Sequence, residues 1–232
     1  MTPDHIVLGV TWYVVFLFST TLHEAAHAFV AHKLGDSTAY QGGQVSLNPI
    51  PHIRREPVGT VIVPLVSFAI SGWMIGWASA PYDPFWASRH HRRAALMALA
   101  GPAANLVLVL AAALAIRAGM SAGAFYPPPS ISFSQVTAAR GEATALVAPL
   151  SILFTLNLIL FVFNLFPLPP LDGSSVLPIF MQPATAERYR AFLHQPMFSL
   201  LGMVLAWNLF GPVFRPVHTL ALNLLYPGVG YQ

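Results

Sequence analysis

The residues best suited to chemistry form the pattern H-E-x-x-H inside an apolar stretch, at His23, Glu24 and His27. On a helix, residues four apart lie on the same face, so the two imidazoles can bind one metal ion. Glu24 is displaced by one position, where its carboxylate can reach a metal-bound water instead of the metal. The pattern therefore predicts two zinc ligands and a general base for hydrolysis.

Two histidines leave such a site incomplete, because catalytic zinc usually has three protein ligands and an open position for water. Asp172 is the best candidate for the third ligand, since it is a lone carboxylate just after a long apolar stretch. Gly173 beside it permits close approach of the backbone. The three prolines just before Asp172 should end the preceding helix, and such irregular backbone is tolerated at membrane depth only within protein or beside a cavity.

Composition places these residues in a membrane protein. Of 232 residues, 56% are hydrophobic and 8% are charged, and the mean hydropathy is +0.63. Soluble domains have about 25% charged residues. The 11 basic residues against 8 acidic ones indicate membrane orientation and not binding to nucleic acid. The absence of cysteine excludes thiolate ligands. A single membrane domain over residues 1–232 accounts for the whole length.

The apolar segments predict an all-α polytopic membrane protein with about four to six membrane segments around the zinc site. Four segments are long enough to cross, namely residues 6–32, 94–116, 144–166 and 197–214. Residues 58–80 are also long enough but are interrupted by Pro64, Gly72 and Gly76, residues 183–195 form a short polar helix, and residues 217–226 are too short to cross alone. The polar stretch 36–48 alternates weakly, which predicts a small membrane-associated β element.

The sequence resembles the site-2 proteases, which are intramembrane zinc metalloproteases of peptidase family M50. HEAAH (23–27) and NLFPLPPLDG (164–173) match the two main signatures of that family, and AGPAAN (100–105) matches a third, weaker element. Similarity extends to GQVSLNPIPHI (43–53) and GWASAPYDP (76–84). The resemblance is to the small prokaryotic branch without PDZ or CBS domains. It covers a catalytic core of about residues 6–180, which leaves C-terminal membrane segments at about 184–226.

The resemblance implies one Zn²⁺ per chain, with ligands His23, His27 and Asp172, and Glu24 as the base. Asn105 and Asn164 occupy positions where the family has polar residues, which implies a role in orienting substrate or stabilising an oxyanion. Hydrogen bonding between helices is an equally good explanation for both asparagines. The expected substrates are membrane proteins cleaved within or near a transmembrane helix, as in regulated intramembrane proteolysis. Substrate identity, cleavage position and oligomeric state stay open.

Ligand depth predicts the topology. His23 lies late in the first span and Asp172 just after the third, so these two spans must run parallel. This requires residues 58–80 to be broken or re-entrant. With this topology, eight basic residues lie on the side of the membrane nearer the metal site and three on the opposite side. Because basic residues are more frequent on the cytoplasmic side, this predicts a cell-membrane protein with its metal site towards the cytoplasm. The larger group is Lys33, Arg54, Arg55, Arg89, Arg92, Arg93, Arg188 and Arg190, and the smaller is Arg117, Arg140 and Arg215.

An unwound substrate helix could add to an exposed strand, and residues 40–47 are the predicted strand for this pairing. Two other protein classes stay possible. A metal carrier could also hold histidine and aspartate in its spans, but it would not need Glu24 beside an open site. An inactive helix-binding relative would have lost a ligand or the base, whereas all four residues are present here.

Overall fold

Four long apolar helices dominate the computed structural model, which describes residues 2–193 and 195–231. Each is long and apolar enough to cross a membrane, if α7 is taken with the 3₁₀ turn before it (Gly141–Leu146). The chain is therefore a multi-pass membrane protein. The four helices are α1 (Pro3–Lys33), α6 (His91–Ser121), α7 (Val147–Asn164) and α10 (Pro196–Leu225).

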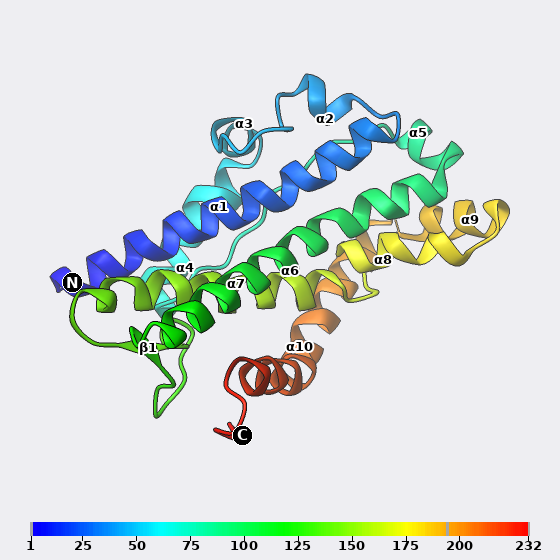
Figure 1. The fold of residues 1–232 in the computed structure, drawn as a ribbon. Helices are drawn as coiled ribbons and strands as arrows, with labels where there is room; N and C mark the ends of the chain where they lie inside the picture. Colours follow the sequence, from blue (N-terminus) through cyan, green and yellow to red (C-terminus); the bar gives the residue numbers. More distant parts are fainter. Residues whose placement is uncertain (1, 194, 232) are drawn as a thin grey trace.

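The helices α1, α6 and α7 lie side by side, with α6 antiparallel to the other two (Figure 1). The prediction that the first and third spans run parallel is confirmed. As a result, the late part of α1 and the chain that follows α7 meet at the same end of the bundle. Large apolar side chains fill the space between helices, as shown by Phe154, Ile116 and Tyr226 in one cluster and Trp12, Phe16 in another.

The predicted break within residues 58–80 is confirmed. A π-helical turn (Val58–Ile62) and α4 (Val63–Ser71) together form only 14 helical residues, too few to cross a bilayer. Gly72 has a φ of 76°, a conformation that favours glycine, and reverses the chain. An extended segment, residues 73–83, then returns towards α5 (Pro84–Arg89), and the N–H of Trp77 donates to the carbonyl of Gly59 at 3.1 Å (Figure 1).

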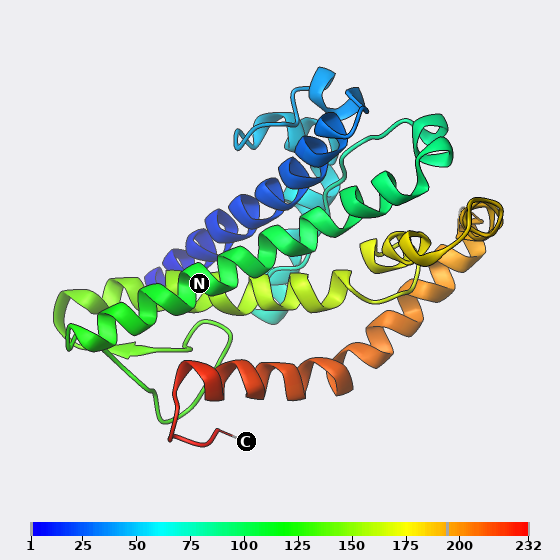
Figure 2. The ribbon, with the colours of Figure 1, turned by 45° about the vertical axis from the view of Figure 1, so that its right-hand side comes forward.

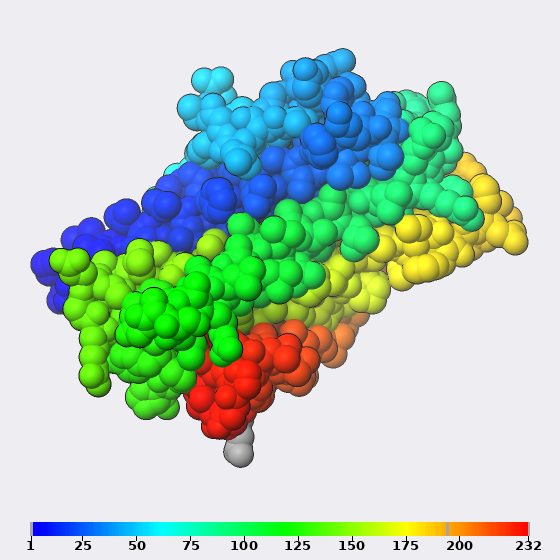
Figure 3. Space-filling view, viewed as in Figure 1, coloured from blue at the N-terminus to red at the C-terminus, as the bar shows by residue number. Residues whose placement is uncertain are grey.

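The predicted strand at residues 40–47 is wrong. This region holds the short helices α2 (Thr38–Gln41) and α3 (Ile50–Arg55) joined by turns, and it forms a raised layer over α1 (Figure 3). One Asp36 oxygen accepts hydrogen bonds from the N–H and hydroxyl of Thr38, at 2.9 and 2.6 Å, which starts a helical turn there. The β element lies instead between α6 and α7, as the antiparallel pair β1 (Phe125–Tyr126) and β2 (Ala138–Ala139).

The C-terminal part differs from the prediction in one respect. After α8 (Asp172–Val176), a 3₁₀ turn (Leu177–Phe180) and α9 (Pro183–Leu193), the chain continues as one helix, α10, where two separate segments were predicted. Pro212 and Pro216 lie inside α10, which bends along its length (Figure 2). Residue 194, part of the predicted polar helix, lies outside the described residues.

Candidate metal centre

His23, His27 and Asp172 converge although 149 residues separate the first from the last. Both histidines are buried on α1, and Asp172 is the first residue of α8. The Nε2 atoms of the two histidines are 3.0 Å apart. One carboxylate oxygen of Asp172 lies 3.1 Å from Nε2 of His23 and 3.3 Å from Nε2 of His27. Gly173 allows this approach, since a Cβ there would collide with the backbone of Leu165.

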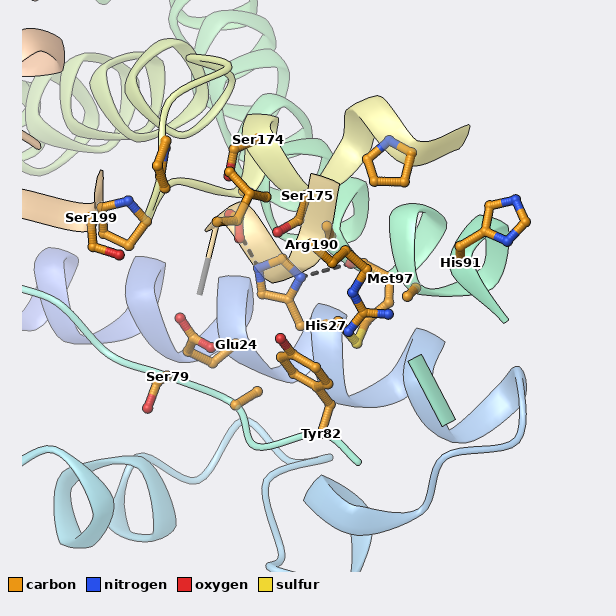
Figure 4. Close-up of a pocket in the computed structure, with 18 of the residues that line it drawn as sticks. Glu24, His27, Ser79, Tyr82, His91, Met97, Ser174, Ser175, Arg190 and Ser199 are labelled. Carbon is orange, nitrogen blue, oxygen red and sulfur yellow. Dashed lines mark hydrogen bonds and ion pairs between the residues drawn. The ribbon is translucent and has the colours of Figure 1, made fainter. Parts of the chain in front are cut away.

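The hydrogen bond at the far side of the His27 ring fixes its tautomer. Its Nδ1 lies 2.7 Å from the carbonyl oxygen of Met97 on α6 (Figure 4). A carbonyl can only accept, so Nδ1 carries the proton and donates it. In the neutral ring the lone pair is therefore on Nε2, which faces the other two site residues.

A longer chain of polar groups fixes the His23 ring in the same way. The amide nitrogen of Asn157 donates to the carbonyl of Leu153 at 2.8 Å and to the hydroxyl of Ser19 at 2.9 Å. Its oxygen therefore accepts from the Asn105 amide nitrogen, at 2.8 Å. The Asn105 oxygen is left facing His23 Nδ1 at 2.6 Å, so this Nδ1 donates and Nε2 again carries a lone pair.

Three electron-pair donors thus point at one another, which requires a positive charge among them. Ligand atoms bound to tetrahedral zinc at about 2.0–2.1 Å lie about 3.3 Å apart, close to the observed separations of 3.0–3.3 Å. Histidines that bind metals usually donate their other ring N–H to a carbonyl or carboxylate, as both rings do here to amide oxygens. The donor set therefore fits a zinc ion with one further open position.

Glycine at position 101 leaves room beside the histidine rings. Gly101 lies on α6, and a Cβ placed on it would fall within 3.0 Å of the Nε2 atoms of both His23 and His27. Any larger residue would press its Cβ against the metal-binding nitrogens of both histidines. Gly101 is thus a requirement of the site that was not recognised from the H-E-x-x-H pattern.

Glu24 is buried next to the histidines and borders two cavities. The polar cavity has a volume of about 400 Å³ and the apolar groove one of about 1120 Å³. Glu24 and Asp172 line both, so the two spaces meet at the candidate site. The polar cavity is also bordered by His27, Ser79, Tyr82, His91, Ser174 and Arg190, and the apolar groove by Phe16, Trp73, Phe163, Asn164, Trp207 and Phe210.

The family model of peptidase family M50 matches residues 11–206, which is most of the chain. The chain belongs to peptidase family M50. It is 31% identical over 223 residues to the "Putative zinc metalloprotease YwhC" of Bacillus subtilis (strain 168), covering 88% of this chain and 92% of that protein. It is 30% identical over 207 residues to the "Putative zinc metalloprotease Rip2" of Mycobacterium tuberculosis (strain H37Rv), covering 88% of this chain and 70% of that protein. No solved structure matches significantly.

Family membership and these relatives make the chain a zinc metallopeptidase. In this M50 peptidase the extended return segment is tied down beside the site. The Ser79 hydroxyl donates to Glu56 at 2.6 Å and accepts from Arg55 at 3.1 Å, and the Ser79 carbonyl accepts from Gln44 at 3.0 Å. These contacts hold Ser79 in place where it lines both cavities.

The two predicted asparagines have different surroundings in this M50 peptidase. Asn105 is fully buried and hydrogen-bonded to His23 and Asn157, whereas Asn164 borders the apolar groove at the end of α7. Sequence reasoning missed Asn157, although an amide in the middle of the apolar stretch of α7 was a usable signal.

Proposed function

We propose that this M50 peptidase is a site-2 protease-like enzyme that cleaves membrane proteins within or near their transmembrane helices, as in regulated intramembrane proteolysis. The meeting of the two cavities at Glu24 and Asp172 carries this proposal. The apolar groove, lined by aromatic side chains from α1, α7 and α10, suits a hydrophobic peptide segment. The polar cavity, which the same two residues border, would admit the water that hydrolysis needs.

In this proposal His23, His27 and Asp172 hold the zinc ion and Glu24 is the general base. Bound zinc lowers the pKa of water to about 7 and polarises the scissile carbonyl. Glu24 then takes a proton from the attacking water and passes it to the leaving amine. Asn105 acts as a positioning residue, because both ends of its amide are used to hold His23 in the required tautomer. Asn164 remains a candidate for substrate contact.

Cleavage should depend on zinc. We expect the purified protein, in proteoliposomes with a tagged single-span substrate, to release two fragments and to contain one zinc ion per chain. Chelation by 1,10-phenanthroline should stop cleavage, and added Zn²⁺ should restore it. The isomer 1,7-phenanthroline, which does not chelate, is the control. Cleavage that survives complete zinc removal, or activity on soluble peptides alone, would contradict the proposal.

We further propose that the site faces the cytoplasm across the cell membrane. Eight of the basic residues belong to the end of α1, to α3, α5 and α9 and to the start of α6, whereas Arg117 lies near the end of α6, Arg140 before α7 and Arg215 in the second half of α10. A reporter fused in the loop of residues 81–93 should therefore report a cytoplasmic position. A fusion after Gly123, between α6 and α7, should report the opposite side. Exchange of these two signals would overturn the orientation.

A further inference from the structure

The polar cavity contains an arginine that has no role in the proposed hydrolysis. Arg190 lies on α9, and its side chain reaches into the cavity on the side where Tyr82 and His27 lie (Figure 4). Its Nη1 atom is buried and has no hydrogen-bond partner among the described residues. No ion pair joins Arg190 to an acidic residue in the described part of the chain either.

This is an unusual condition for a guanidinium group. Arginine stays charged at any physiological pH, and burying one of its N–H groups without an acceptor costs free energy. The two carboxylates that border the cavity do not offset this cost. Asp172 contacts the histidines, and Glu24 is not paired with Arg190. The donors of Arg190 are therefore available to a negatively charged group that enters the cavity.

The position of Arg190 is fixed relative to the candidate metal site. The hydroxyl of its neighbour Tyr189 donates to the carbonyl of Ser174 at 3.1 Å, and Ser174 is two residues after Asp172. Helix α9 is thus anchored directly to α8. A second nitrogen without a partner, Nε2 of His91 at the start of α6, is also buried at the wall of the same cavity. Two separate elements thus bring unpaired nitrogens to one space.

We propose that Arg190 binds a carboxylate of the peptide inside the polar cavity. The inference rests on the proposed protease function, because hydrolysis of a peptide bond itself produces this group. The C–N bond breaks, water oxygen forms the new C–O bond, and the N-terminal fragment leaves with a carboxylate while the other fragment leaves with an amine. Arginine binds carboxylates through two parallel hydrogen bonds, which makes it the suitable residue.

The carboxylate has two possible sources, the new C-terminus of the product or an aspartate or glutamate side chain near the cleaved bond. Three fluorescently labelled apolar octapeptides separate them in detergent solution. The first has a free C-terminal carboxylate, the second has a C-terminal amide, and the third has the amide and one internal aspartate. Fluorescence anisotropy gives each Kd for the full chain carrying Glu24→Gln, so that nothing is cleaved.

We expect the free carboxylate, the internal aspartate or both to improve binding roughly tenfold or more over the plain amide, as charged hydrogen bonds do. Arg190→Gln should reduce this ratio to about one, and Arg190→Lys should keep part of it. Arg188→Gln is the matched control, since Arg188 is exposed on the same helix and does not border the cavity. It should retain the full ratio.

Repeating the titrations after zinc removal excludes direct binding of the carboxylate to the metal. A ratio that is unchanged by Arg190→Gln, or one that is near unity in the parent protein without zinc, would overturn the inference. Zinc content and elution volume of each variant show that it is folded. Failure of the proposed function is seen separately, as absence of cleavage by the unmodified enzyme, because the peptide titrations need no turnover.

Discussion

Replacing Glu24 with Gln should reduce cleavage of a transmembrane substrate by about 10²–10⁴-fold, the usual contribution of a general acid–base residue. Glutamine keeps the size of the side chain but cannot take a proton from water. Glu24 borders both cavities and is not among the three converging donors, so the zinc content should stay at one ion per chain. Cleavage rate and metal content, measured on the same preparation, test this directly.

Glu142→Gln is the matched control, because Glu142 is exposed in the connection before α7. It should leave both cleavage and zinc unchanged. Full activity of Glu24→Gln with zinc bound would mean that another group is the base. A protein that holds zinc but cleaves nothing, with or without Glu24, would instead favour a metal carrier.

The convergence of the site could be predicted because each half has a local signature. His23 and His27 are four residues apart on one helix, so their closeness follows from the sequence alone. Asp172 comes just after the prolines that follow the end of another helix, α7. The parallel course of α1 and α7 followed from requiring the two halves to meet at one depth. That requirement also predicted the reversal of the chain that Gly72 makes.

The errors arose where a local hydrogen bond or the surrounding protein outweighs a pattern. Weak alternation suggested a strand at residues 40–47, but the carboxylate of Asp36 accepts two hydrogen bonds from Thr38, where a helical turn begins instead. The sequence was divided into segments 197–214 and 217–226, although Pro212 and Pro216 both lie inside one helix. Within a membrane helix, however, neighbouring groups can compensate for the missing N–H donors, so α10 bends and continues.

A third group of residues received no role from the sequence. Asn157 acts through Asn105, Gly101 acts by having no side chain, and Arg190 reaches the cavity only because α9 folds back beside α8. Each role depends on contacts between elements far apart in the sequence. Such roles become visible only when the packing is known.

Gly101 gives the second large expected effect. Gly101→Ala should lower zinc affinity by roughly 100-fold or more, beyond the 10–100-fold typical of changes behind the ligands. The reason is steric, since the new methyl group would contact Nε2 of both His23 and His27. Cleavage should be lost with the metal. Zinc content after dialysis against a competing chelator, with the cleavage rate, measures both effects.

The same substitution should not destabilise the zinc-free protein through its helix, because alanine favours a helix by about 1 kcal/mol over glycine. The rise in Tm on adding zinc should disappear, and this difference between the two states is the quantity to measure, because the new methyl group also presses on the histidine rings when zinc is absent. Ala103→Val enlarges an exposed side chain on the same turn of α6 and should keep the rise in Tm on adding zinc.

If Gly101→Ala bound one zinc ion with unchanged affinity, the metal could not lie between the histidine pair and the backbone of α6.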